Sequence, residues 1–405
     1  MISCSLSPNT ETDDVWLALK VMLSPGIWKK GSFIDEAERW FSDYFRDSEA
    51  VSFNSGRSAL LGILKAFNIG QGDEVLVQAF TCVAVPNSVL WAGAKPVFVD
   101  IDETLNVDVQ DARSKISSKT KALIVQHTFG SPADMKQLTI FAKKHGIFLI
   151  EDCAHSLGAL YNGKKVGSFG DASFFSFGRD KVISSVWGGM GVIRAKHKAQ
   201  CRALRTYQRQ LPIPSLFWIF QQLFHPIAFS VILASYNIWL GKILLFGMQK
   251  FHLLSFPVYS DEKKSKRPAG FPAIFPNALA ILALNQLKKL DRYNRGRRAV
   301  AAYFRKRLYR DTILPDVGGS IYLRFPFVVN NPSALIERAK KHGVLFGNWY
   351  QHIIDPAGVS FFALGYKIGS CPRAEYIASR IVNLPTRVSL TDAAKIVSLC
   401  LNKSL

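Results

Sequence analysis

Acidic residues and cysteines are both scarce in this chain of 405 residues. The six cysteines are scattered, and no two of them form a Cys-x-x-Cys pair. That spacing excludes a disulfide framework and a zinc-ribbon pattern, and it is typical of a reducing compartment. The chain also does not start with a basic region followed by an apolar stretch, so we expect no signal peptide. These features predict a cytoplasmic protein without a metal site.

The shortage of acidic residues leaves the chain strongly basic. Lys and Arg number 51 against 30 Asp and Glu, which gives a formal net charge of +21. Such a balance favours a polyanionic partner, namely nucleic acid, anionic lipid or a phosphate-bearing substrate. The sequence shows no zinc-finger spacing, RNA-binding signature or recognition-helix motif. We therefore expect no nucleic acid partner and favour the other two classes.

The first half of the chain alternates short apolar runs with amphipathic segments. This alternation predicts an α/β fold in which a mostly parallel sheet carries helices on both faces. Ligands in such sheets gather at the carboxyl ends of the strands. The predicted strands are 75–80, 96–101, 122–129 and 147–150, and the predicted helices are 58–67, 86–91 and 133–144.

A smaller α/β region is predicted from about residue 320 to the C-terminus, and a long basic helix over 277–310 connects it to the rest. Its predicted strand is 321–329 and its predicted helices are 333–342, 374–382 and 392–401. We therefore expect three parts. They are a large domain over 1–200, an apolar and basic insert over 201–268, and the connecting helix with the small domain over 269–405.

The insert contains the longest stretch without charge. No Asp, Glu, Lys or Arg occurs from residue 210 to 241, and basic residues flank the stretch on both sides. Its core, 227–241, is shorter than the roughly 20 residues that a spanning helix needs, and Pro212, Pro214 and Pro226 are expected to break it. We expect segment 211–256 to lie on an anionic membrane surface. A buried insert that packs on the core or widens a dimer interface is nearly as favoured, and a spanning hairpin is less so.

Two polar motifs lie where the sheet prediction places ligands. Asn54-Ser55-Gly56-Arg57 follows a strand-like run and opens a helix, which is a ready site for a phosphate. Gly56 allows close approach and Arg57 adds a fixed charge. An ordinary helix N-cap would use the same residue types. Asp152 ends the run 146–150, where a carboxylate also serves as a metal ligand, a cap or a solvated loop residue.

The order of the polar residues narrows these alternatives. Ser176 ends another predicted strand, and Lys181 follows five residues later. A lysine can hold an aldehyde as a Schiff base, an aspartate can keep a pyridine nitrogen protonated, and a serine can hold a phosphate. Those are the groups that pyridoxal phosphate (PLP) requires from a protein. His155, taken alone, is more often a packed histidine than a catalytic one.

Several ordered blocks resemble the sugar aminotransferases of the DegT/DnrJ/EryC1/StrS family, PLP enzymes of fold type I. The resemblance covers about residues 15–200 and 270–395. The blocks include Ala37-Glu38-Arg39-Trp40-Phe41, Gly93-Ala94-Lys95-Pro96-Val97-Phe98-Val99-Asp100 and Asn383-Leu384-Pro385-Thr386.

The resemblance implies a role for each motif residue. Lys181 would attach the cofactor, Asp152 would pair with its ring nitrogen, and His155 would lie beside the ring. The phosphate would be held by Ser176, Gly56 and the backbone near Ser55. Lys181 also separates this chain from the dehydratase branch of the family, which carries His there.

Three departures from the family pattern concern the cofactor site. Arg57 stands where the family usually has Thr, and Cys82 occupies the ring-stacking position that is often aromatic. The Gly-x-Asn-x-Arg block, whose Asn reaches the neighbouring subunit's cofactor, aligns with Gly270 to Ile274, so Pro272 and Ile274 replace its polar residues. We therefore expect Arg57 to contact the phosphate in their place.

The resemblance implies an aminotransferase that takes an amino group from an amino acid donor, glutamate, and passes it to a nucleotide-linked keto-sugar for surface polysaccharide or glycan biosynthesis. It also implies a homodimer with active sites at the interface. Two alternatives stay open, namely a non-catalytic or regulatory protein on the same scaffold and a different PLP reaction.

Overall fold

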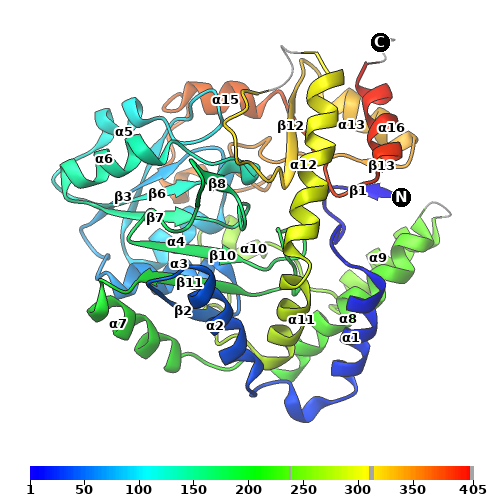
Figure 1. Ribbon diagram of the computed structural model, residues 1–405, viewed down its shortest axis with the longest axis horizontal. Coiled ribbons are helices and arrows are strands. Elements are labelled where there is room, and N and C mark those ends of the chain that lie inside the picture. The colour runs from blue at the N-terminus through cyan, green and yellow to red at the C-terminus, as the bar shows by residue number, and fades with distance from the viewer. Residues whose placement is uncertain (237–238, 310–313, 402–405) are drawn as a thin grey trace.

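The computed structural model describes residues 1–236, 239–309 and 314–401. At its centre is a seven-stranded sheet in the order β2-β11-β10-β7-β6-β3-β5 (Figure 1). Strand β11 runs antiparallel to both of its neighbours, and the remaining pairs are parallel. This confirms the predicted mostly parallel sheet. In sheet order the strands are Ser48–Phe53, Gly189–Arg194, Ala172–Ser176, Phe148–Asp152, Thr120–Gln126, Glu74–Gln78 and Lys95–Val99.

Both faces of the sheet are covered by helices, which is why its strands read as continuous apolar runs. Successive side chains of a strand point to opposite faces. In β6, Ala122 and Ile124 join the core cluster that contains α3 and α4, whereas Leu123 and Val125 join the cluster of α5 and α6. The helices are α2 (Phe33–Tyr44), α3 (Gly56–Ala66), α4 (Ala84–Ala92), α5 (Val109–Lys115), α6 (Met135–His145) and α7 (Lys198–Arg209).

The C-terminal region builds a smaller domain around a two-stranded antiparallel sheet. Strands β12 (Arg324–Val328) and β15 (Ile381–Pro385) pair along their length, and α12, α13 and α16 supply the apolar side chains that cover them. The start of the chain also belongs here, because β1 (Ile2–Ser3) pairs with β13 (Val344–Leu345). Figure 1 accordingly shows β1 and α16 on the same side of the molecule.

Two predictions for this region are wrong in part. The helix predicted over 374–382 ends earlier, as α15 (Pro372–Ala378), because Ile381 and Val382 instead pair with β12. The single basic helix predicted over 277–310 is two helices, α11 (Asn277–Leu287) and α12 (Leu290–Arg307), and Arg310 lies outside the described residues. The other elements are η1 (Pro25–Ile27), η2 (Thr128–Gly130), β4 (Thr81–Cys82), β8 (Leu160–Tyr161), β9 (Lys164–Lys165), β14 (Ile354–Asp355), α13 (Pro332–Lys341), α14 (Phe361–Leu364) and α16 (Leu390–Leu401).

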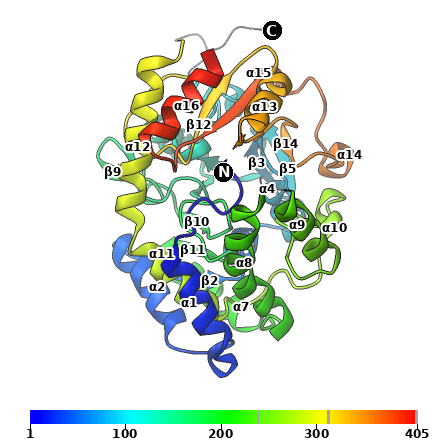
Figure 2. The same cartoon turned by 90° about the vertical axis from the view of Figure 1, so that its right-hand side faces the viewer.

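The insert forms the helices α8 (Leu216–Ala234), α9 (Leu240–Lys250) and α10 (Ser260–Lys263). Pro226 lies inside α8, so the break predicted at this proline is wrong. A proline removes one backbone hydrogen bond, and here the helix is held by its packing against α1 (Thr12–Met22) and α11 (Figure 2). The predicted apolar core 227–241 is therefore divided between α8 and α9, and residues 237–238 lie outside the described part.

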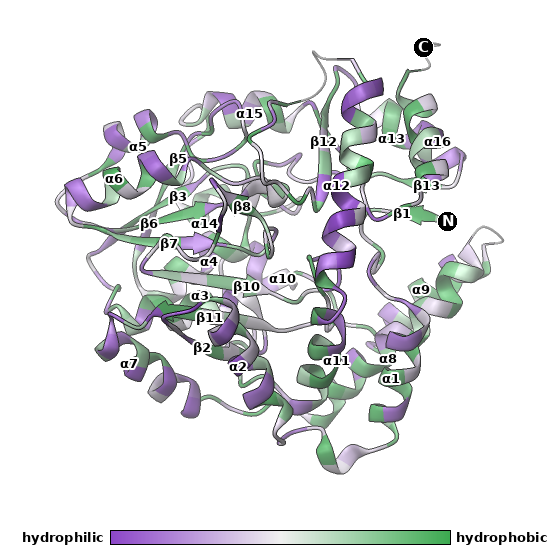
Figure 3. Cartoon of the chain, viewed as in Figure 1, coloured by the Kyte–Doolittle hydropathy of each residue, from purple (hydrophilic) through white to green (hydrophobic). Residues whose placement is uncertain are grey.

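Helix α8 is the one helix, among the residues described, that is long and apolar enough to cross a membrane, with a mean hydropathy of 1.6. Figure 3 shows its apolar character. Within the structure 44% of its apolar window is buried, including Ile219, Leu223 and Ile232. A core helix of a globular protein meets the same test. The apolar surface of α9 is different, because Ile243 and Phe246 are 66% and 68% exposed.

Candidate active site

A cavity of about 600 Å³ lies at the carboxyl ends of the central strands. Gln126, Asp152 and Ser176, the last residues of β6, β7 and β10, all line it. The small domain and the insert complete its walls, so three segments of the chain meet there. Every site residue predicted from the sequence lies in this lining, namely Ser55, Gly56, Arg57, Cys82, Asp152, His155, Ser176 and Lys181.

Asp152 is the carboxylate that the strand geometry directs to the cavity. Its neighbour Glu151 points the other way, where its oxygens accept hydrogen bonds from the N–H groups of Gly167, Phe169 and Gly170 at 2.6–2.7 Å. Asp152 accepts only one such bond, from Ala154 N at 2.9 Å. Burial raises the pKa of Asp152 to about 6. A cation beside its free oxygen would hold the carboxylate ionised.

Glu151, His127 and Cys153 form a buried group whose ligand-type atoms lie within 4.8 Å of one another. Structural contacts account for this arrangement. His127 Nδ1 accepts a hydrogen bond from Ala133 N at 3.1 Å, and its Nε2 lies 3.1 Å from Glu151 Oε2. With the loop amides also bound to Glu151, the group fixes the wall behind Asp152.

Lys181 and His155 are in contact within the cavity. The Lys181 Nζ lies 3.0 Å from His155 Nε2. Burial, followed by the charges of Lys181 and Arg324, lowers the pKa of His155 well below its usual value. The neutral ring then accepts a hydrogen bond from the lysine through Nε2 and carries its proton on Nδ1. The ring stacks on Phe129 at 5.9 Å between centroids, which fixes its orientation.

The start of α3 forms a cradle for an anion. Ser55 caps the helix by accepting a hydrogen bond from Ser58 N. The N–H groups of Gly56 and Arg57 have no partner among the residues described. A Cβ on Gly56 would lie 2.9 Å from the Ser176 Cβ, so the close approach of α3 to β10 requires glycine. Free helix amides beside a serine hydroxyl suit a phosphate.

The Arg57 side chain is engaged by the insert. Its guanidinium pairs with Glu262, whose side chain is fully buried, and also donates to the Pro257 carbonyl at 2.7 Å. It lies 5.0 Å from the ring centroid of Trp187. The expected contact between this side chain and a phosphate stays a prediction. Sequence reasoning missed Glu262. One signal was present, because the chain has no acidic residue between Asp180 and Asp261, so an acidic residue that follows this long basic and apolar stretch is unusual.

Arg324 is a second site residue that sequence reasoning missed. It opens β12, is 1% exposed, and pairs with Asp180, the residue before Lys181. Its guanidinium lies 3.5 Å from the centroid of the Trp349 ring, which also lines the cavity. One signal was present, because Arg324 is the lone charged residue in the apolar run 321–329.

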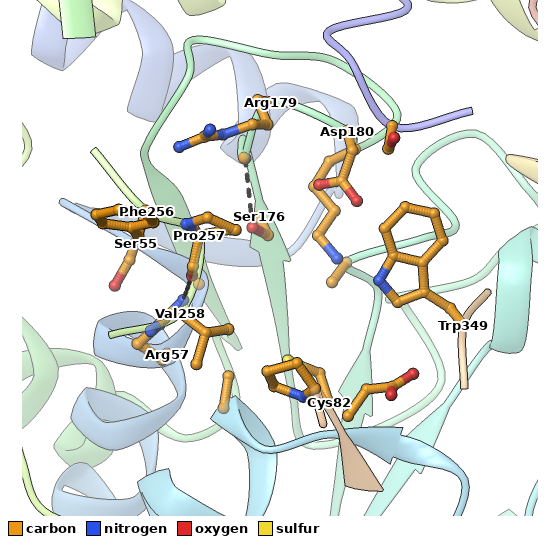
Figure 4. A pocket seen from close by; sticks show the side chains of 18 of the residues that line it. Ser55, Arg57, Cys82, Ser176, Arg179, Asp180, Phe256, Pro257, Val258 and Trp349 are labelled. Carbon is orange, nitrogen blue, oxygen red and sulfur yellow. Dashed lines mark hydrogen bonds between the residues drawn. The ribbon is translucent and has the colours of Figure 1, made fainter. Parts of the chain in front are cut away.

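Cys82 lies in β4, which pairs with β14 of the C-terminal half. This short pairing, together with Arg324, joins the two halves of the chain around the cavity. Burial raises the pKa of the Cys82 thiol, so the side chain presents a neutral surface to the cavity. Figure 4 shows Cys82 and Trp349 on the side of the cavity away from Arg179.

Comparison with known proteins gives this geometry a family context. The model of the DegT/DnrJ/EryC1/StrS aminotransferase family matches residues 9–211 and 246–399. The stretch between these matches, 212–245, contains α8 and the first part of α9. Only this part of the insert lies outside the family match, whereas residues 201–211 and 246–268 lie inside it.

Curated relatives fall into two groups by coverage. The GDP-perosamine synthase of Vibrio cholerae is 44% identical over 41% of this chain and 46% of its own, so the match spans about half of that relative. The UDP-N-acetyl-3-dehydro-alpha-D-glucosamine 3-aminotransferase of Acidithiobacillus ferrooxidans is 30% identical over 84% and 79%. The pleiotropic regulatory protein of Geobacillus stearothermophilus is 29% identical over 88% and 84%.

Solved structures share the fold. A Streptococcus pneumoniae protein solved in its PLP form superimposes with a TM-score of 0.72 at 21% identity, covering 96% of this chain and 95% of that one. The architecture is that of PLP enzymes of fold type I. By the extent of the sequence match, the chain belongs to the DegT/DnrJ/EryC1/StrS aminotransferase family, whose cofactor is PLP.

Proposed function

We propose that this protein is an aminotransferase that passes an amino group from glutamate to a nucleotide-linked keto-sugar in the biosynthesis of a surface polysaccharide or glycan. The observation that carries the proposal is the meeting of Lys181, Asp152 and the α3 cradle in one cavity. The names of the perosamine synthase and the glucosamine aminotransferase support the substrate class.

The residues present fit the cofactor. Bound PLP supplies an electron sink for bond breaking at the donor's α-carbon. Lys181 is the amine that attaches the cofactor aldehyde and, once released, moves a proton at that carbon. Asp152 keeps the ring nitrogen protonated, and His155 orients the lysine amine.

The cradle fits the other end of the cofactor. Ser55, Gly56 and Ser176 would hold the phosphate, together with the backbone N–H of Arg57. Cys82 would contribute a neutral thiol on the ring side of the cavity, which leaves the charge of the ring nitrogen to Asp152.

The remaining volume of the cavity suits two anionic substrates, the amino acid donor and the nucleotide-linked sugar acceptor. Lys263 comes from the insert and Arg324 from the small domain, and both line the cavity. Cations at two walls favour the diphosphate of a nucleotide-linked sugar and the carboxylates of an amino acid. The overall charge of +21 draws such substrates toward the protein.

A two-step measurement tests the function. The PLP-loaded protein should change its visible absorbance on addition of glutamate, and a panel of nucleotide-linked keto-sugars should then show one substrate whose mass shifts on amination. The Lys181→Ala variant serves as the matched control. A loaded protein whose spectrum stays constant with every amino acid tested would contradict an aminotransferase.

A regulatory role is the second candidate. The full-length similarity to a pleiotropic regulatory protein favours it, as does the replacement of the family's polar block by Pro272 and Ile274. A regulatory protein would bind PLP without responding to an amino donor. A different PLP reaction would respond to the donor without aminating any sugar of the panel.

Assembly as a homodimer is supported by an exposed apolar surface on α1 and the turn after it. Trp16 and Leu23 there are 66% and 74% exposed. A dimer that buries them would remove this surface from water. Sedimentation velocity of the Trp16→Glu, Leu23→Glu double variant should show a monomer where the parent protein shows a dimer.

A peripheral membrane contact of this cytoplasmic enzyme is proposed for α9, the part of segment 211–256 that leaves apolar side chains exposed. Ile243 and Phe246 stand on its surface with Lys242 and Lys250, the combination expected of a helix on anionic lipid. The protein should sediment with anionic liposomes at low salt, and Ile243→Glu should abolish this. Equal sedimentation of both proteins would contradict the contact.

A further inference from the structure

Two arginines reach the end of the cavity that contains the α3 cradle, and they differ in their partners. We propose that Arg179, held by the insert, is the cationic ligand of the cofactor phosphate, whereas the Arg57 side chain positions the insert. The proposal rests on the proposed function and names a residue that the family resemblance did not suggest.

Arg57 has its charge balanced within the protein. Glu262 is the partner of its guanidinium, and the same carboxylate accepts a hydrogen bond from Tyr259 N at 2.8 Å. The Glu262 carbonyl in turn accepts a bond from Asn87 Nδ2 at 2.8 Å. The ion pair therefore ties α10 to α3, and the Asn87 bond ties it to α4. A dianionic phosphate would have to compete with a buried carboxylate for this guanidinium.

Arg179 has no such carboxylate among the residues described. Its guanidinium donates to the Ser255 carbonyl at 2.7 Å, and its neighbour in sequence, Asp180, pairs with Arg324 instead. The Arg179 side chain is half-buried, and burial lowers its pKa to about 10 although the charge of Asp180 acts in the opposite direction. A half-buried cation without a carboxylate in direct contact is stabilised by a bound anion. An anion bound in the cradle would supply that counter-ion.

Arg179 lines the same cavity as the cradle. It lies three residues after Ser176 on the loop that leads to Lys181, so all three side chains come from one short segment of chain. In the view of Figure 4, Phe256 and Pro257 are drawn between Arg179 and Arg57. The cradle would then bind the phosphate with neutral N–H donors on one side and a cation on the other.

The insert fixes Arg179 through Ser255. The Ser255 Oγ accepts a hydrogen bond from Trp187 Nε1 at 3.0 Å and donates to Gln222 Oε1 at 2.9 Å. Gln222 belongs to α8 and is fully buried. The carbonyl that accepts from Arg179 is thus positioned by α8, which lies in the stretch outside the family match. Helix α8 would thus support the cofactor site through Ser255 and Arg179.

The experiment compares PLP with pyridoxal, which lacks the phosphate, on cofactor-free protein. Binding is followed by absorbance and by quenching of tryptophan fluorescence, so activity is not needed. Arg179→Gln should weaken PLP by about 10- to 100-fold, as expected for loss of a charge-assisted contact, and leave pyridoxal unchanged. Arg295→Gln, at an exposed arginine outside the cavity lining, is the matched control and should leave the ratio of PLP to pyridoxal affinity unchanged.

Each other outcome has a defined meaning. An unchanged ratio in Arg179→Gln, or an equal fall in Arg295→Gln, overturns the assignment and leaves the proposed function intact. Parent protein that binds neither compound overturns the proposed function itself. If Arg179→Gln does not fold, Arg179→Lys replaces it, and the single-point cation should lower the ratio several-fold.

Discussion

Asp152→Asn should make the cofactor-free protein more stable while it removes the aminotransferase activity. The side chain of Asp152 is 5% exposed and accepts a single hydrogen bond, from Ala154 N. An asparagine oxygen can accept the same bond. The substitution therefore removes a buried negative charge with little change in packing, and the charge is needed only when a protonated ring nitrogen is bound beside it.

The pKa of the carboxyl sets the size of the effect. Burial raises it from 3.8 to about 6, so the folded protein binds the proton more tightly than the unfolded chain. Each pKa unit corresponds to about 1.4 kcal/mol, and the ionised carboxylate thus lowers the stability of the cofactor-free protein by about 3 kcal/mol above pH 7. The penalty falls to about half by pH 5 and disappears below the unfolded pKa. Asparagine carries no such penalty.

Urea unfolding of cofactor-free parent and variant protein at pH 5 and pH 8 measures the difference directly. The variant should be more stable at both values, with the larger gain at pH 8, because titration of all other groups cancels in the comparison. With PLP present, the same variant should bind weakly and lose most of its turnover. A variant that is less stable than the parent at pH 8, or a gain that does not change with pH, would refute the argument.

Three further substitutions test other parts of the site. Lys181→Ala should fold normally yet form no borohydride-reducible bond to PLP; a reducible adduct in that variant would assign the attachment elsewhere. Glu262→Gln should lower the free energy of unfolding by about 3–5 kcal/mol, since it leaves a buried guanidinium unpaired. Adding Arg57→Gln to it should cost less than the sum of the two single changes. Gly56→Ala should weaken PLP at least tenfold through the contact with Ser176, whereas Gly296→Ala, where a Cβ meets nothing within 4 Å, should have no effect.

Local patterns in the sequence were sufficient to predict the scaffold and to select residues that the structure places in one cavity. The buried strands, the helix start at Ser55 and the order of Asp152, Ser176 and Lys181 can all be recognised because each depends on residues close together in the chain. The carboxyl ends of parallel strands lie at one edge of a sheet. Motifs that follow these strands are therefore brought together by the sheet itself, independently of the sequence elsewhere in the chain. The structure brings all of these residues into one cavity.

Domain boundaries at 200 and 268 stay predictions, although the packing of α7 against α3 shows that the first insert residues lie on the large domain. The end of the helix predicted over 374–382 failed for a general reason. Ile381 and Val382 take the conformation that their partners in β12 impose, and those partners are more than 50 residues away. Propensity gives way to strand pairing in such a case.

What the sequence by itself determined, then, is the set of chemical groups at the strand ends. Tertiary structure alone decided how their charges are balanced. Glu262 reaches Arg57 from the insert, and Arg324 reaches Asp180 from the small domain. No periodicity or spacing records such pairs, because the attraction between two buried charges depends on distance in space and on exclusion of water, not on separation along the chain. For the same reason, the apolar sequence of α8 does not record that α1 and α11 pack against it, because those contacts exist only in the folded chain.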